Sequence, residues 1–387
     1  MRHLIILFLL FFSFVCVADQ SSLINSKASD APLNVILMIG DGMGRVQRDA
    51  ATRFYLHQPA KLVMDRLLIQ TQIKTDSLDG VTDSAASATA FATGIKTHNH
   101  VIGLDKEGKP RKNLTELAKE KFMSVGLVTT TQIAHATPAA FVAHVKHRKQ
   151  MTTIAEQLSA SDVDVLLGGG ENDFLPKRES GRYEKPGHRN DARNLINTFK
   201  QKSFVYVSNK VELEKVDETK VNKLIGLFAD KGMDVPHSPN LKLMTEKALA
   251  ILSKNKNGFF LMAEGGQIDW AAHQNNAKQA MENTYHFDLA VGLARTFVED
   301  NPNTLLIVTA DHETGGMRVD EDEIETLKNA VEFIDKQGKS FYVSWSTKGH
   351  TGVPVPLSAM GKGAEYFSSV NDNTHVFSVI RDLWGFK

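Results

Sequence analysis

The feature of this sequence that most restricts its fold is a set of short, wholly apolar runs separated by segments of helical length. VILMI at 35–39 and LLIVT at 305–309 contain no charged residue, and such runs suit strands that are covered on both faces of a sheet. The alternation predicts a mostly parallel, doubly wound α/β sandwich. We expect strands at 34–39, 68–74, 124–130, 163–167, 204–207, 258–263 and 304–309, and helices at 113–122, 240–253 and 281–299.

The composition excludes several other kinds of protein. The 387 residues are 42% hydrophobic, and 45 Lys and Arg balance 45 Asp and Glu. A disordered chain would need fewer apolar residues or a large net charge, and a nucleic-acid-binding surface normally shows a basic excess. No internal repeat or Pro/Ser-rich linker divides the chain. We therefore interpret it as one domain, with the polar stretches 170–240 and 318–346 as insertions at the rim of the sheet.

Residues 1–18 are typical of a secretory signal peptide. Arg2 precedes a 12-residue apolar run, Leu4–Val15, and small residues follow it at the expected cleavage site. The run is too short to span a bilayer comfortably. Cleavage would leave 19–387 as the single domain and would remove Cys16, the one cysteine of the chain. The sequence thus predicts a periplasmic or secreted protein, without disulfides and without a membrane span.

Asp41 is the first polar residue placed where a predicted strand ends, which is where α/β proteins bind ligands. It lies in NVILMIGDGMG. A dinucleotide-binding turn would need a third glycine where Arg45 stands. An aspartate that only caps the following helix is the alternative interpretation.

Ser84, in VTDSAASATAFATG, is the second candidate. Thr82 and Asp83 can cap a helix whose first turn contains Ser84, and a hydroxyl there faces free N–H groups that favour an anion. A plain, alanine-rich core helix ending at Gly94 is the alternative. The segment does not match a GxSxG turn, so a nucleophilic Ser84 would need something other than a histidine base. A divalent metal would suffice.

Three later segments offer metal ligands. In FFLMAEGGQIDWAAH, Glu264 ends a strand, and Asp269 and His273 share one helix face at i and i+4, which suits chelation. A simple Asp–His salt bridge would explain the same spacing. The other two segments are NTLLIVTADHETGG and STKGHTGVP, which supply Asp311, His312 and His350. Each residue has an ordinary explanation by itself, but the convergence of carboxylates and histidines at strand ends favours a metal site.

These segments resemble the motifs of the alkaline phosphatase family. IGDGMG, TDSAASATA, ATPAAFVAH with HRK, EGGQIDWAAH, VTADHETGG and GHTG occur in the family's order, from about Asn34 to the C-terminus. The resemblance implies a three-layer α/β/α sandwich, usually a homodimer, with two Zn²⁺ and one Mg²⁺ per subunit. It also implies a secreted phosphomonoesterase that acts through a phosphoserine at Ser84 and releases inorganic phosphate, and it makes 19–387 the catalytic domain.

The resemblance also assigns roles to residues by motif. The first zinc would take Asp269, His273 and His350, the second Asp41, Asp311 and His312, and the magnesium Asp41, Thr137 and Glu264. Arg148 would grip two phosphate oxygens, for which a planar guanidinium is suited, and Asp83 would orient it. With the Ser84 alkoxide counted, the formal charge of such a site is +1, which attracts a phosphate dianion and still allows product to leave.

Two positions depart from the best-known bacterial pattern. His135 stands where that pattern has an aspartate near the magnesium, and Trp270 stands where it has a lysine near phosphate. The pair resembles that of other short bacterial members. Because imidazole is a poorer magnesium ligand than carboxylate, His135 leaves the identity of the third metal open. It could instead hold a water beside the metal. We interpret His144 and His147 as solvated residues on a helix near Arg148.

Two other functions are weighed against a phosphomonoesterase. A phosphodiesterase or another metal-dependent member of the same superfamily is the nearest, but Arg148 suits a terminal phosphate dianion. A module that binds metal or phosphate without catalysis is the other, and it would not need Ser84 as a nucleophile. We expect phosphate monoesters and inorganic phosphate as partners, and no specific binding of nucleic acid.

Overall fold

The computed structural model describes residues 33–57, 60–322 and 330–386. The predicted signal segment 1–18 lies outside the described residues. Among the described residues, no helix is both long enough and apolar enough to cross a lipid bilayer.

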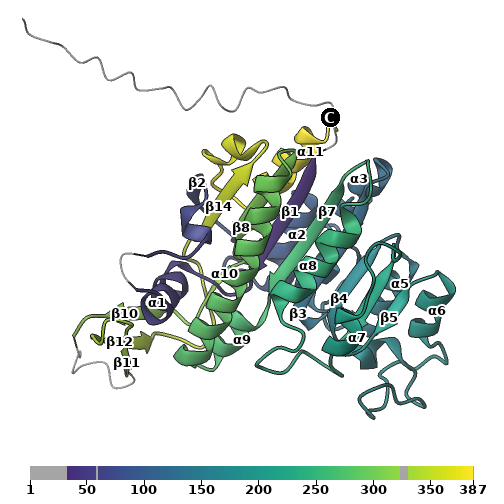
Figure 1. The fold of residues 1–387 in the computed structure, drawn as a ribbon, viewed down its shortest axis with the longest axis horizontal. Helices are drawn as coiled ribbons and strands as arrows, with labels where there is room; N and C mark the ends of the chain where they lie inside the picture. Colours follow the sequence, from purple (N-terminus) through teal and green to yellow (C-terminus); the bar gives the residue numbers. More distant parts are fainter. Residues whose placement is uncertain (1–32, 58–59, 323–329, 387) are drawn as a thin grey trace, which may run out of the picture. The chain divides into compact units, whose positions relative to one another are not determined.

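A nine-stranded sheet forms the centre of the fold (Figure 1). Strand β14 pairs antiparallel with both β2 and β8, and the other neighbouring strands pair in parallel. The mostly parallel sheet predicted from the sequence is therefore confirmed. In spatial order the strands are β2 (Ile69–Ile73), β14 (Val355–Gly361), β8 (Thr304–Thr309), β1 (Asn34–Gly40), β7 (Phe259–Gly265), β3 (Ser124–Gln132), β4 (Val165–Gly169), β6 (Leu224–Leu227) and β5 (Val205–Val207).

Two groups of helices pack beside this sheet, and each group is internally in contact. The first includes the long helix α10, which touches β1, β7 and β8 and lies beside α8 in Figure 1. Its members are α1 (Arg45–Tyr55), α8 (Leu241–Leu252), α9 (Gln267–His273) and α10 (Ala277–Asp300). The second consists of α2 (Ser84–Thr93), α3 (Leu114–Glu120), α4 (Ala136–Ala140) and α11 (Thr374–Leu383). Strands β4 to β6 alternate along the chain with helices α5 (Met151–Ala160), α6 (Leu195–Gln201) and α7 (Lys210–Glu214).

The central strands are apolar because both of their faces are covered. Every residue of β7 and β8 is buried, and so is every residue of β1 after Asn34. Helix α2 is also buried along its whole length, and its Ala, Ser and Thr side chains are small enough for close packing on several sides. The apolar runs of the sequence thus form the central strands of the sheet, where both faces are covered.

Several strands were not predicted. Strand β6 has only four residues, and β14 contains Pro356 and Ser358, so neither carries a long apolar signal. The polar stretch 170–240 holds β5 and β6 at the sheet edge. The stretch 318–346 contributes to a separate three-stranded sheet of β10 (Met317–Asp320), β12 (Ser340–Trp345) and β11 (Val331–Ile334). A short pair, β9 (Glu313–Thr314) with β13 (His350–Thr351), completes the strands.

Candidate active site

Several of the predicted site residues lie at or just beyond the carboxyl ends of four neighbouring strands, β8, β1, β7 and β3. Asp41 comes directly after β1, and Glu264 is the last residue but one of β7. Asp311 lies just beyond β8, while Thr137 is on α4 beyond β3. Since parallel strands end at the same edge of a sheet, residues from distant parts of the chain meet here.

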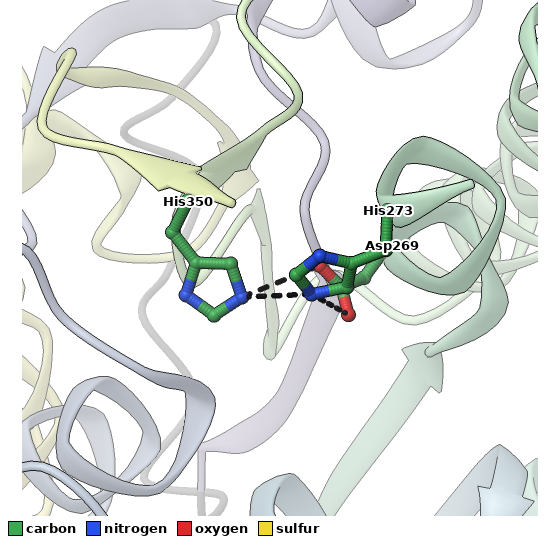
Figure 2. A group of neighbouring side chains, drawn as sticks. All are labelled: Asp269, His273 and His350. Carbon is green, nitrogen blue, oxygen red and sulfur yellow. Dashed lines mark hydrogen bonds and ion pairs between the residues drawn. The ribbon is translucent and has the colours of Figure 1, made fainter. Parts of the chain in front are cut away.

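Asp269, His273 and His350 form the first of three groups that could hold a metal ion (Figure 2). Helix α9 carries the first two, one turn apart, and Asp269 Oδ2 lies 3.3 Å from His273 Nε2. His350, on β13, places its Nε2 3.6 Å from Asp269 Oδ1 and 3.1 Å from His273 Nε2. Ligand atoms of these three residues, carried by α9 and β13, therefore face one another.

Backbone carbonyls fix the orientation of both imidazoles in this group. Nδ1 of His273 donates to the Lys348 carbonyl, and Nδ1 of His350 donates to the Thr82 carbonyl at 2.8 Å. A proton held on Nδ1 leaves the lone pair of Nε2 free, which is how metal-binding histidines are usually oriented. Without a metal, the hydrogen bond from His273 Nε2 to Asp269 raises the pKa of His273 to about 9, so a metal ion would displace that proton, whereas burial lowers the pKa of His350 to about 4.

A second group surrounds His312, whose side chain is fully buried. Its Nε2 lies 3.5 Å from Asp41 Oδ1, 3.3 Å from Asp311 Oδ2 and 3.3 Å from Ser84 Oγ. Asp41, Asp269 and His312 also place ligand atoms within metal-binding range of one another. Asp269 thus faces both groups, which the sequence did not indicate.

The third group consists of Asp41, His135 and Glu264. His135 precedes α4, and its Nδ1 is buried without a hydrogen-bond partner. The Thr137 hydroxyl is likewise buried and unpartnered. One oxygen of Glu264 accepts from the Thr129 hydroxyl, while the other has no partner. The structure therefore brings His135 directly beside the two carboxylates.

These donor sets fit divalent metal ions, because the buried ligand atoms lack other partners. Both oxygens of Asp41, Oδ2 of Asp311 and Oε1 of Glu264 are buried and accept no hydrogen bond. Burial and neighbouring carboxylates raise the pKa of Asp41 well above its ordinary value and that of Asp311 to about 6. Burial also raises the pKa of Glu264 to about 7. Buried carboxylates without partners are costly unless cations neutralise them.

Burial acts on the neighbouring imidazoles in the opposite sense. It lowers the pKa of His312 to about 4 and that of His135 to about 3. Both rings are therefore neutral near neutral pH, which is the state in which imidazole binds a metal. Carboxylate and neutral imidazole together match the preferences of zinc, and a more oxygen-rich set would suit magnesium.

Ser84 begins α2 and is almost fully buried. Asp83 is the N-cap, and its Oδ1 accepts from Ala86 N at 3.0 Å. This cap explains why the helix starts here, and it leaves the Ser84 hydroxyl at the positive end of the helix dipole. Of the two predicted capping residues, Asp83 caps the helix, whereas the Thr82 hydroxyl donates to the Asp83 carbonyl.

Arg148 reaches the same region from the loop before α5. Its Nη1 donates to Asp83 Oδ2 at 2.9 Å, and its Nη2 lies 3.2 Å from His135 Nε2. Although burial acts to raise the pKa of Asp83, Arg148 and the Ala86 N–H lower it on balance. Asp83 is therefore an ionised partner that holds one edge of the guanidinium.

Trp270 stands on α9 beside this group, with its ring centroid 6.0 Å from that of His135. Gly232 lies against the indole, because a Cβ at that position would come within 2.4 Å of Trp270 Cη2. The loop around Gly232 is held by Gln267, whose side chain donates to the carbonyls of Met233 and Thr130.

Two further residues escaped the sequence interpretation. Glu313 is buried and accepts from Gln47 Nε2, Gly316 N, Met317 N and Thr351 Oγ1, so it joins the segments that carry His312 and His350. His100 contacts Asp83. Neither residue lies at a predicted strand end. The only available signal in the sequence was the position of Glu313 inside VTADHETGG.

The interpretation of His144 and His147 as helix-surface residues was wrong. Both lie in the irregular stretch between α4 and α5. His144 Nδ1 contacts the Gly103 carbonyl at 2.8 Å, and the hydrogen bond that His144 donates to Glu116 raises the pKa of His144. The segment does not continue as a helix because its backbone groups bond across to other loops, as Val145 does with Ile102.

Comparison with known proteins gives consistent findings. The family model described as alkaline phosphatase matches residues 33–341. Alkaline phosphatase 4 of Bacillus subtilis is 36% identical, and the alignment covers 90% of this chain and 87% of the relative. The structure of alkaline phosphatase from the Antarctic bacterium TAB5 superposes with a TM-score of 0.79 at 33% identity, and covers 92% of this chain and 99% of that chain. A TAB5 variant in which a histidine is replaced by aspartate, described with Mg bound in the M3 site, gives a TM-score of 0.77 at 31% identity, with coverage of 92% and 99%.

Proposed function

The chain belongs to the alkaline phosphatase family and is a metal-dependent phosphatase, and on that premise we propose that it hydrolyses phosphate monoesters through a phosphoserine on Ser84. The observation that carries the proposal is the position of Ser84 Oγ, 3.3 Å from His312 Nε2. A nucleophile thus stands at the edge of the buried donor groups, with Arg148 bound to the neighbouring Asp83.

We propose two zinc ions and one magnesium ion per subunit. The first zinc would be held by Asp269, His273 and His350, the second by Asp41, Asp311 and His312, and the third ion by Asp41, Thr137 and Glu264. When bound, such ions supply positive charge that lowers the pKa of a hydroxyl and stabilises a leaving alkoxide. The carboxylate oxygens that lack a hydrogen-bond partner among the described residues support this assignment.

The chain's own residues then carry out two in-line displacements. Arg148 binds two non-bridging oxygens of the ester with its remaining N–H groups, and Asp83 keeps it in place. Ser84 gives its hydroxyl proton to solvent water and its Oγ attacks phosphorus, so that the ester P–O bond breaks and the leaving alkoxide takes a proton from solvent to become the alcohol. Water next attacks the phosphoserine from the opposite side, which restores Ser84 and releases inorganic phosphate. Two inversions give net retention at phosphorus.

His135 bears on the third ion. It lies within metal-binding range of Asp41 and Glu264, and we propose that it either binds that ion directly or holds a water beside it. The TAB5 variant with Mg in its M3 site has an aspartate in place of a histidine. We propose by analogy that His135 weakens the binding of magnesium at this site, because imidazole suits zinc better.

Location, domain organisation and assembly are also proposals. The signal-like residues 1–18 support export to the periplasm or beyond, with 19–387 as the catalytic domain. We propose a homodimer because the family resemblance implies one, and gel filtration with light scattering would test it.

One experiment tests the reaction. Phosphate release would be measured from an aryl phosphate and from the matching diester, with and without chelator, for wild type and Ser84→Ala. The proposal expects monoester preference, loss of activity with chelator and loss of turnover in Ser84→Ala. Ser161→Ala, which removes a hydroxyl that donates to Leu158 at the end of α5, is the matched control. Diester preference would favour a phosphodiesterase, and full activity of Ser84→Ala would refute the proposal.

Trapping the intermediate gives an independent readout. The enzyme would be mixed with substrate, quenched in acid and digested, and the peptide containing Ser84 would be examined by mass spectrometry. We expect added phosphate on Ser84. Phosphate on another residue, or on none after a quench within one turnover, would contradict the mechanism.

A further inference from the structure

His100 has a backbone conformation that is unusual for a residue with a side chain. Its φ is 71°, in the left-handed region that glycine adopts freely and that other residues adopt at a cost. Such conformations persist where the surrounding contacts require them, and they gather at functional sites. The contacts of His100 therefore indicate what the conformation is for.

Asp83 is the first of these contacts. The backbone N–H of His100 donates to Asp83 Oδ1 at 3.1 Å, and its ring Nδ1 lies 3.0 Å from Asp83 Oδ2. The same Oδ1 accepts from Ala86 N, and the same Oδ2 accepts from Arg148 Nη1 at 2.9 Å. Both oxygens of the carboxylate are thus shared between His100 and a second partner.

The segment of Arg148 is the other contact. The His100 carbonyl accepts from Arg148 N at 2.8 Å. The His100 ring stacks on the ring of His147, with centroids 5.1 Å apart and an interplanar angle of 17°. His100 therefore touches the arginine from its backbone side, while Asp83 holds the guanidinium end. The three residues form a closed loop of contacts.

We propose that His100 is a positioning residue that fixes the orientation of Arg148 by holding both Asp83 and the Arg148 backbone. The proposal rests on the proposed function, because it assumes that Arg148 grips phosphate. The side chain of His100 is itself more than half exposed at 57%, so packing does not explain why a histidine occupies a backbone position that favours glycine. Its hydrogen bond to Asp83 does.

The physical consequence concerns the freedom of the guanidinium. An arginine held at one edge by a fixed carboxylate presents its other N–H groups in one direction, and binding then loses less conformational entropy. Without the imidazole, Asp83 Oδ2 keeps only Arg148 as a side-chain partner, and the carboxylate is fixed only at Oδ1, by the N–H groups of Ala86 and residue 100. Phosphate affinity should fall while the fold stays intact.

Two substitutions separate the imidazole from the backbone. His100→Gly removes the ring and also suits the positive φ, so it should not lower the unfolding temperature. His100→Asn keeps a donor, since Asn Nδ2 lies as many bonds from Cβ as His Nδ1, and Asn tolerates this conformation. His98→Asn is the matched control, because His98 lies in the same loop but contacts Asp79 at 2.7 Å instead of Asp83.

The readout is binding of inorganic phosphate by titration calorimetry to the metal-loaded protein, together with KM and kcat for an aryl phosphate. His100→Gly should weaken phosphate binding and raise KM roughly five- to tenfold, with kcat changed less, as expected for loss of one hydrogen bond of typical strength. His100→Asn should recover most of the affinity, and His98→Asn should behave as wild type.

Other results would overturn the proposal. Phosphate affinity of His100→Gly equal to wild type would do so, and so would an equal loss in His98→Asn or failure of His100→Asn to recover affinity. A lowered unfolding temperature with parallel loss of metal would show a merely structural role. An inactive wild type, or an active Ser84→Ala, would instead refute the proposed function, and the calorimetric comparison of His100 variants would still stand by itself.

Discussion

Replacing Glu264 with glutamine isolates the electrostatic cost of the buried carboxylates in the metal-free protein. Burial raises the pKa of Glu264 from its ordinary 4.5 to about 7, and one of its oxygens accepts no hydrogen bond. Glutamine has nearly the same shape and carries no charge, and its carbonyl can still accept from Thr129. We therefore expect Glu264→Gln to stabilise the metal-free chain at alkaline pH.

The magnitude follows from the pKa. Because a tenfold change in proton affinity equals about 1.4 kcal/mol, a pKa of about 7 in place of 4.5 corresponds to about 3 kcal/mol. Below pH 4.5 the carboxyl is protonated in both folded and unfolded chains, so the variant gains nothing there. Between 4.5 and about 7 only the unfolded chain releases the proton, and wild-type stability falls relative to the variant as pH rises. Above that window the difference is constant.

The assay is urea unfolding of chelator-treated protein at pH 4.5 and at pH 8, followed by circular dichroism. Glu313→Gln is the matched control, because Glu313 is an equally buried glutamate whose oxygens accept four hydrogen bonds. Its replacement sets an amide N–H₂ against N–H donors and should lower the free energy of unfolding by about 1–3 kcal/mol. The two variants should thus differ in sign at pH 8.

Three results would refute the reasoning. The first is a metal-free Glu264→Gln that is less stable than wild type at pH 8. The second is the same gain at pH 4.5 as at pH 8, which would show an effect other than ionisation. The third is stabilisation by Glu313→Gln as well, which would mean that removing any buried carboxylate suffices.

Three further changes and one control have defined outcomes. His135→Asp should raise magnesium affinity about tenfold, because a carboxylate replaces imidazole, and retained Mg²⁺ after dialysis measures it. Trp270→Lys should lower the phosphate inhibition constant about fivefold, as one added charge worth about 1 kcal/mol predicts; an unchanged constant would contradict this. Gly232→Ala places a new Cβ 2.4 Å from the Trp270 ring, so the ring should be displaced. The phosphate inhibition constant should then change at least about twofold, which corresponds to a fraction of 1 kcal/mol. Gly292→Ala, whose Cβ would meet only Val63 at 3.6 Å, should leave the constant unchanged and raise the free energy of unfolding by up to about 1 kcal/mol.

Much of the fold could be predicted from local patterns. The strand predicted at 304–309 has those bounds, and the helix predicted at 240–253 is found at Leu241–Leu252. A covered strand needs a continuous apolar run, and a helix needs its cap and period, so both leave a signal within a few residues. Strands β6 and β14 left none, because a four-residue strand and a strand containing proline depend on their neighbours for pairing.

The candidate site divides in the same way. Asp269, His273 and His350, which the resemblance assigns to one ion, lie together, and so do Asp41 and Glu264 of the predicted set Asp41, Thr137 and Glu264. The resemblance placed His135 near the third ion, and the structure brings it beside Asp41 and Glu264. The sharing of Asp269 between two groups was not predicted. No spacing in the sequence reports which atoms of a residue remain unpartnered after folding.

The sequence by itself determined which segments become covered strands and which polar residues stand where they end, because hydrophobic period and capping act over a few residues. Only the tertiary structure decided that His312 meets Ser84 across 228 positions of the chain, that Asp41 keeps both oxygens free, and that His100 holds Asp83. The reason is physical. Those contacts depend on the order in which parallel strands pair and on where the helices between them return, and this information is distributed over the whole sheet.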